Sequence, residues 1–431
     1  MKQEKVTGLN RTLGFWSLFF CSIGVILGAG IYVLIGKAAG LGGNAVWLSF
    51  GLSALLAAFT GLSYAELVSM FPKSSAEYGY TKKALGERTG FITGILIILA
   101  SFISAATVAV GFAGYFSRLF NTNIVPTAIM LIIVLSLVLI YGIKESAIMA
   151  VVFTLIELLG LVIVIWVGIP YFGSVNYLDM PNGFSSVLAA AALIFFAYIG
   201  FEEITRLGEE TKKPEKVIPK VLLLSILIST ILYMLVAVAA VSVLNWQDLA
   251  ASKAPLAEVV ATVLGEKAFL LISVIALFAT ANTVLFIMLA GSRIIYGMAV
   301  EKVFSSKMSY ILKNRKTPAY AILVTALFTA LFAMIGDIEV IASLTDFAIF
   351  AVFIIINVVV IVLRYKEPYT ARPFRVPVSI GKIPLLPLLG ILASFTMLFH
   401  LDFWIIFYGL LLVIGLFFAY EIKKKYFPIK G

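Results

Sequence analysis

The stretch IGVILGAGIY at residues 23–32 interrupts the first long apolar run of this chain with glycine, and FFAYIGFE at residues 195–202 interrupts the sixth. Glycine makes a helix about 1 kcal/mol less favourable than alanine does. Unwinding is therefore easiest where Gly28 and Gly30 stand two residues apart. Glycine pairs also occur where membrane helices pack closely. The corresponding positions of the two segments favour unwinding, because paired interrupted segments mark a binding site at the membrane midplane.

The composition indicates that lipid surrounds most of the chain. Hydrophobic residues make up 62% of the 431 residues and charged residues 13%, whereas apolar residues are about 45–50% of a soluble domain. So few polar groups could not cover a water-soluble protein of this length. Cys21 and His400 are the single residues of their kinds, so we expect no disulfide, no metal and no cofactor. A soluble enzyme, a secreted disulfide scaffold and a disordered chain are excluded.

Twelve apolar runs are long enough to cross a membrane as helices, since one crossing needs about 20 apolar residues. They are too long for barrel strands and lack strict alternation. The runs cover residues 13–36, 44–71, 89–117, 124–142, 147–172, 184–205, 219–244, 268–298, 318–335, 341–363, 384–400 and 403–421.

The basic residues predict the orientation of these runs. With the N-terminus inside, 28 of the 32 lysines and arginines fall in cytoplasmic segments, the exceptions being Lys37, Arg118, Lys253 and Lys267. Such segregation is typical of a multi-pass protein of the cytoplasmic membrane, here with both termini cytoplasmic. We expect the basic runs to contact anionic lipid headgroups. No basic face interleaved with aromatic residues indicates nucleic acid as a partner.

The sequence therefore predicts an all-α polytopic membrane protein with 12 transmembrane helices. The two interrupted runs, the first and the sixth, are five runs apart. We therefore expect a five-plus-five inverted repeat with discontinuous helices 1 and 6, plus peripheral helices 11 and 12. The expected divisions are a cytoplasmic tail (1–12), a first repeat (13–172), a second repeat (184–363), the peripheral helices (384–421) and a second cytoplasmic tail (422–431).

A helix broken at mid-membrane presents unpaired backbone groups. In the first run the amides of Gly28, Ala29 and Gly30 would point into the gap, where the positive helix terminus suits a carboxylate. Ile26 joins this expected carboxylate-binding set. In the sixth run the carbonyl groups near 196–199 would suit an ammonium group. An anion site that faces a cation site describes a zwitterion, so we expect a small free amino acid as the substrate.

Two acidic residues in the apolar runs are candidates for coupling to an ion. Glu157 lies more than ten residues into the fifth run, where a charge costs roughly 2.5–3.5 kcal/mol, so acids at such depth are functional hypotheses. Burial favours the protonated form of a carboxyl group, and Glu157 could carry one proton per cycle. Glu202 would begin the inner half of the sixth run, either as a helix cap or as a protonation sensor.

Other polar residues at depth leave the choice of ion open. Thr280, Asn282 and Thr283 offer oxygens in the eighth run that could hold Na⁺ beside the first run. Glu66 is expected to tie helix ends together. Asp346 is expected to be interfacial, near the outer end of its run.

Four motifs resemble the amino acid–polyamine–organocation (APC) superfamily, above all its prokaryotic amino acid permeases and its cationic amino acid transporter branch. The motifs are GVILGAGIY (24–32), YAELVSMFPKSSAEYGY (64–80), FFAYIGFEEITRLGEETKKPEKVIP (195–219) and LRYKEPYTARPFRVP (363–377). The resemblance implies the five-plus-five fold and alternating access. It also implies a substrate carboxylate on Gly28, Ala29 and Gly30, and a substrate amino group on the carbonyls of Phe196, Ala197 and Ile199.

Two residues depart from the family pattern. Ala29 stands where relatives have serine, so recognition there is left to backbone amides. Glu157 stands where several sodium-independent relatives have lysine, so the lysine mechanism does not carry over, whereas Glu202 matches an acidic position implicated in proton sensing. We therefore expect a secondary active transporter for a small amino acid, with proton coupling favoured; an exchanger or sodium symporter on the same fold is the alternative. An intramembrane enzyme or a channel fits the pattern poorly.

Overall fold

The computed structural model describes residues 13–73, 75–141, 144–208, 211–312, 315 and 317–426. The expected N-terminal tail (1–12), and residues 427–431 of the C-terminal tail, lie outside this description.

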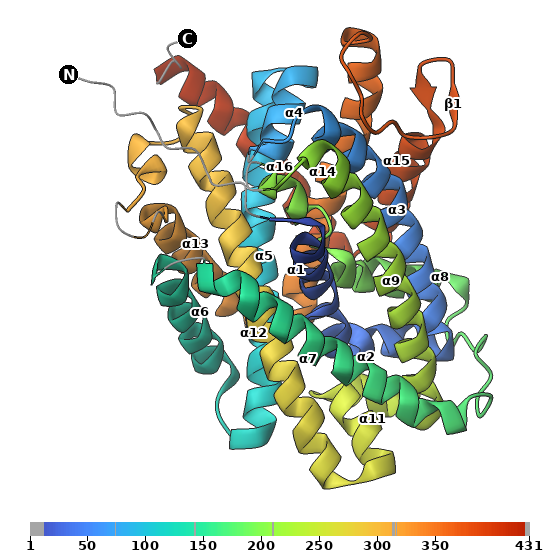
Figure 1. Cartoon of the computed structure of the whole chain (residues 1–431). Helices are drawn as coiled ribbons and strands as arrows, with labels where there is room; N and C mark the ends of the chain where they lie inside the picture. Colours follow the sequence, from blue (N-terminus) through green and yellow to red (C-terminus); the bar gives the residue numbers. More distant parts are fainter. Residues whose placement is uncertain are drawn as a thin grey trace.

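The described chain is almost entirely helical, as the apolar runs predict (Figure 1). The α-helices are α1 (Phe15–Leu27), α2 (Gly30–Gly42), α3 (Val46–Met70), α4 (Ala76–Leu85), α5 (Glu87–Phe120), α6 (Ile124–Tyr141), α7 (Lys144–Gly168), α8 (Phe184–Ile194), α9 (Pro214–Val243), α10 (Trp246–Ala251), α11 (Pro255–Leu264), α12 (Glu266–Val300), α13 (Ala319–Ala333), α14 (Ile338–Lys366), α15 (Leu385–Leu398) and α16 (Phe403–Tyr426). The short 3-10 helices are η1 (Gly43–Ala45), η2 (Ile169–Tyr171), η3 (Phe195–Tyr198), η4 (Glu203–Leu207) and η5 (Ser306–Ser309). Strands β1 (Ser379–Ile380) and β2 (Ile383–Pro384) pair antiparallel.

Nine helical stretches among the described residues are long and apolar enough to cross a membrane. The first, Phe15–Met70, is 56 residues long and contains α1, α2 and α3. Helices α13 and α15, which coincide with the ninth and eleventh apolar runs, are shorter than this criterion requires. The prediction of an all-α polytopic membrane protein is confirmed, and the count of twelve spans stays a prediction.

The interrupted first helix lies inside the bundle. Helix α1 packs against α7, α9 and α12 (Figure 1). Helix α2 packs against α8 and α10. In the most apolar window of Phe15–Met70, 89% of the residues are buried, against 11% in the window of Phe403–Lys425. The first helices therefore form the centre of the bundle, and α16 lies on its surface.

Candidate functional site

The first helix is broken between α1 and α2, at Gly28 and Ala29, as the glycine pattern predicts. The amide of Gly28 still donates to the carbonyl oxygen of Gly24 at 3.2 Å, so the expectation that this amide points free into a gap is wrong. The amides of Ala29 and Gly30 have no backbone acceptor within the described part of the chain. The donors left for an anion are therefore those at the start of α2.

Ile26 presents an acceptor and not a donor at this break. Its carbonyl oxygen accepts a hydrogen bond from the hydroxyl of Tyr233. A carbonyl oxygen repels a carboxylate, so this atom does not support the expected contact between Ile26 and a substrate carboxylate, which stays a prediction.

The sixth helix is broken at η3, where α8 ends. Gly200 follows with a φ of 120°, which side chains disfavour, and a Cβ atom there would overlap with Val25 of α1. The carbonyl oxygen of Phe196 accepts from the amide of Ile199 at 3.2 Å, and that of Ala197 accepts from Tyr233 at 2.9 Å. No hydrogen-bond partner of the Ile199 carbonyl is found among the described residues.

The two breaks lie against each other. A Cβ atom at Gly30 would overlap with the backbone and side chain of Ala197, so the backbones approach as closely as a missing side chain allows. The gap expected between the carboxylate and amino-group sites is closed in this conformation. Both residues are fully buried.

Three buried tyrosines, which the sequence analysis did not single out, hold this region together. The hydroxyl of Tyr233 on α9 lies within hydrogen-bond distance of one carbonyl oxygen at each break, those of Ile26 and Ala197. Tyr32 of α2 donates to the carbonyl oxygen of Glu157 at 2.8 Å, and Tyr115 of α5 donates to the carbonyl oxygen of Tyr32 at 2.8 Å. The sequence signal that could have identified them is a tyrosine in the middle of an apolar run, because a buried tyrosine hydroxyl normally needs a hydrogen-bond partner.

Glu157 of α7 is fully buried and faces α12. The side-chain amide of Asn282 donates to Glu157 Oε1 at 3.0 Å. Glu157 Oε2 and Asn282 Oδ1 both lack a partner among the described residues. The structure thus joins two of the residues expected to take part in ion coupling, and leaves one oxygen of each unused.

The two threonines of the coupling set differ in what they contact. Thr280 donates to carbonyl oxygens of its own helix, the nearest at 2.6 Å. Thr283 also donates within α12, at 3.1 Å to Ala279, but its Oγ1 lies where a Cβ atom of Gly28 would be. Only Thr283 therefore touches the break in the first helix.

Glu202 stabilises the turn between η3 and η4 and does not cap a helix. Its Oε2 accepts from the amide of Gly200 at 3.0 Å, and η4 has no side-chain cap. The cap interpretation is wrong, because the carboxylate folds back by two residues. One helical turn on, the buried Arg206 pairs with Glu77 of α4 at 3.0 Å.

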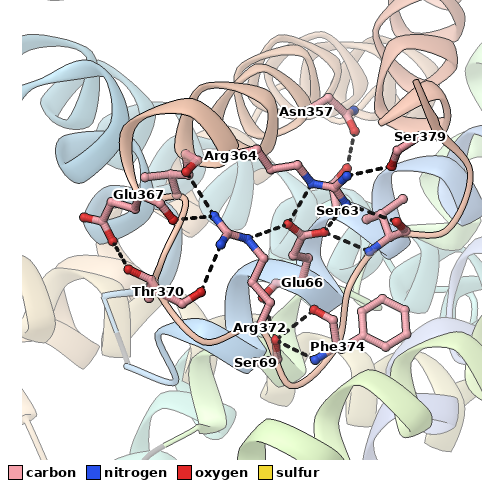
Figure 2. Close-up of polar contacts among 12 residues, drawn as sticks. Ser63, Glu66, Ser69, Asn357, Arg364, Glu367, Thr370, Arg372, Phe374 and Ser379 are labelled. Atoms are coloured by element: carbon pink, nitrogen blue, oxygen red, sulfur yellow. Dashed lines mark hydrogen bonds and ion pairs between the residues drawn. The ribbon is translucent and has the colours of Figure 1, made fainter. Parts of the chain in front are cut away.

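Glu66 ties helix ends together as expected (Figure 2). Its carboxylate accepts from Arg364 of α14 at 2.6 Å and from Arg372 at 3.2 Å, and the amide of Val376 donates at 2.8 Å. One buried acid thus fixes α3 to α14 and to the loop that follows it.

Asp346 does not lie at the membrane interface, so the expectation for this residue is wrong. The residue is fully buried in α14, and neither carboxylate oxygen has a partner among the described residues. The apolar run placed it near the outer end of α14, whose first turn is exposed at Glu339 and Val340, but Asp346 lies about two turns further in, within the buried stretch 345–350. Burial of this residue depends on packing that linear sequence does not show.

A bundle of helices long enough to cross a membrane, with two interrupted helices in contact at its centre and an acid buried beside one of them, is an arrangement typical of transporters. The family model for amino acid permeases matches residues 13–421, so the chain belongs to this amino acid permease family of the APC superfamily. The expectation of a transporter and not an enzyme is thereby confirmed.

Individual relatives agree with this membership. The branched-chain amino acid permease BcaP of Bacillus subtilis (strain 168) is 31% identical over 97% of this chain and 94% of its own length. The methylthioribose transporter of the same organism is 29% identical over 90% of this chain and 88% of its own. The vacuolar cationic amino acid transporter 4 of Arabidopsis thaliana is 28% identical over 85% of this chain and 66% of its own.

Proposed function

We propose that this protein is a secondary active transporter that moves a small amino acid across the cytoplasmic membrane by alternating access. The observation that carries the proposal is the contact of Gly30 with Ala197, where two interrupted helices meet inside the bundle. Amide donors lie on one side of this contact and carbonyl acceptors on the other. Separation of the two breaks would open a space between opposite dipoles.

The two ends of an amino acid suit these groups. The amides of Ala29 and Gly30 have no backbone acceptor within the described chain and would bind the carboxylate at the start of α2. The carbonyl oxygens of Ala197 and Ile199 would bind the amino group. Two of the relatives carry amino acids in their names, but the third is named for methylthioribose, so the test of substrate includes that compound.

The Glu157–Asn282 pair favours a proton over sodium as the coupling ion. A protonated carboxyl group has an O–H donor and a carbonyl acceptor, which can pair with the carbonyl acceptor and one of the two N–H donors of a side-chain amide. Glu157 Oε2 and Asn282 Oδ1 are the atoms left over, so protonation would let a small rotation complete a second hydrogen bond. Loss of the proton would leave a buried charge with one hydrogen bond, which favours rearrangement beside α1.

The twelve-span topology with two inverted repeats (13–172 and 184–363) is part of the proposal. The stretch Phe15–Met70 is longer than one crossing needs, which fits two spans. Helix α4 and strand β1, from segments expected inside, lie at one end of the bundle, and α11, from a segment expected outside, lies at the other (Figure 1). This arrangement supports cytoplasmic termini.

The test is uptake by the purified protein in liposomes. Labelled L-alanine, L-leucine, L-lysine and methylthioribose are offered under an inward proton gradient, an inward sodium gradient, or neither. Accumulation of an amino acid under the proton gradient alone supports the proposal, and the sodium gradient tests the symporter alternative. Accumulation of methylthioribose without any amino acid would overturn the substrate assignment.

A further inference from the structure

The hydroxyl of Tyr233 lies between the two interrupted helices. It donates toward the carbonyl oxygen of Ile26 in α1, and it lies 2.9 Å from the carbonyl oxygen of Ala197 in η3. The side chain is fully buried on α9. A phenol has a single proton, so it satisfies one of these acceptors at a time. Tyr233 is therefore one donor shared by the two breaks.

One of these acceptors is a group proposed above for the substrate. An ammonium group offers three charged donors, and a charge-assisted hydrogen bond is roughly twice as strong as a neutral one. The ammonium group would therefore outcompete the hydroxyl for Ala197. The carbonyl oxygen of Ile26 gives the displaced hydroxyl another acceptor within reach.

We propose that Tyr233 stands in for the substrate amino group in the empty carrier, and so allows the empty carrier to close and return across the membrane. This inference rests on the proposed function. Ala197 is buried in this conformation, with Gly30 against its backbone, so its carbonyl oxygen needs a donor from the protein. Tyr233 supplies it, and net transport becomes possible without obligatory exchange.

The surroundings of Tyr233 provide a matched control. Tyr198 is also fully buried, and its ring centroid lies 5.3 Å from that of Tyr233. Its hydroxyl donates to the carbonyl oxygen of Phe50 on α3 at 3.1 Å, and not to an acceptor assigned to the substrate. Tyr198→Phe thus removes the same atom, at nearly the same place, without touching the proposed competition.

The experiment compares net uptake with exchange in liposomes. Wild type, Tyr233→Phe and Tyr198→Phe are assayed with whichever of labelled L-alanine, L-leucine and L-lysine wild type carries fastest. Net uptake is measured as entry of label into empty liposomes. Exchange is measured as entry of label into liposomes preloaded with the same unlabelled amino acid. Tyr233→Phe should lower net uptake about tenfold, the effect of about 1.4 kcal/mol. Its exchange rate should stay within about threefold of wild type, and its KM for exchange should fall.

Other results bear on the inference in distinct ways. An equal fall of net uptake and exchange in Tyr233→Phe, or no change in either rate, would overturn the inference. A loss of net uptake with normal exchange in Tyr198→Phe would also overturn it. Wild type that carries none of the three amino acids would overturn the proposed function instead. If Tyr233→Phe does not fold, 3-fluorotyrosine at position 233 retains the hydroxyl. Its fluorine resonance should shift on saturation with that amino acid, and an unchanged resonance would also overturn the inference.

Discussion

Gly30 lies directly against Ala197, so that the second half of one broken helix rests on the turn of the other. The two residues are far apart in the chain, and helix packing at the centre of the bundle brings them into contact. Because the two backbones touch, a side-chain atom added at Gly30 would force them apart.

Replacement of Gly30 by alanine should abolish transport, because the added Cβ overlaps with Ala197 and prevents closure. We expect at least a tenfold loss of uptake in liposomes and a destabilisation of about 1–3 kcal/mol from overpacking. Gly415→Ala is the control, since that glycine in α16 has nothing near the added atom. Normal uptake by Gly30→Ala would show that the breaks do not need this contact.

Glu157→Gln should abolish accumulation driven by a pH gradient while it spares exchange. The amide cannot carry a proton through the cycle, but it can keep a hydrogen bond with Asn282. Uptake with and without an imposed gradient measures the difference, and Glu266→Gln on the exposed start of α12 is the control. If accumulation persists in Glu157→Gln, the coupling assignment is wrong.

Glu66→Gln should lower the stability of the protein by about 3–5 kcal/mol, because it leaves Arg364 buried without its charge partner. Thermal melting in detergent gives the readout. Glu421→Gln removes the partner of Arg88 in a half-exposed pair, where at most about 1 kcal/mol is expected. Equal shifts in the two variants would mean that burial of the Glu66 cluster adds nothing.

Asp346→Val should raise the melting temperature. The substitution removes two buried oxygens without partners, each of which costs about 1–3 kcal/mol. Thr345→Val, at the neighbouring buried position, removes a hydroxyl that donates to Ile341 and should not raise it. A lower melting temperature for Asp346→Val would reveal a partner for the carboxylate in solution.

Glu367 should make a small contribution to stability that depends on pH. Partial burial raises its pKa, but hydrogen bonds with Lys83 and Thr370 outweigh this effect and hold the pKa below its usual value. A lowered pKa stabilises the folded state above the unfolded value near 4.5, and the contribution is lost as pH falls through the folded value. Glu367→Gln should therefore melt slightly below wild type at pH 7, by at most about 1 kcal/mol. The two curves should coincide at a pH below the folded value, and a difference that persists there would contradict this account.

Sequence reasoning was most successful where a backbone preference decides the structure. Glycine at 28 and 30 weakens a helix wherever it occurs, so the first break could be located from the chain alone. It was least successful for the amide of Gly28, because a broken helix can offer either its amides or its carbonyls, and neighbouring residues decide which remain free.

The sequence by itself determined that this is a helical membrane protein with two interrupted helices, and its motifs pointed to the transporter family. Hydrophobicity and glycine act locally, so these properties are readable without coordinates. Only the tertiary structure decided that the breaks touch, that Tyr233 serves both, that Glu157 meets Asn282, and that Asp346 is buried. Those relationships join residues far apart in the chain, and the packing of whole helices sets the distance between them.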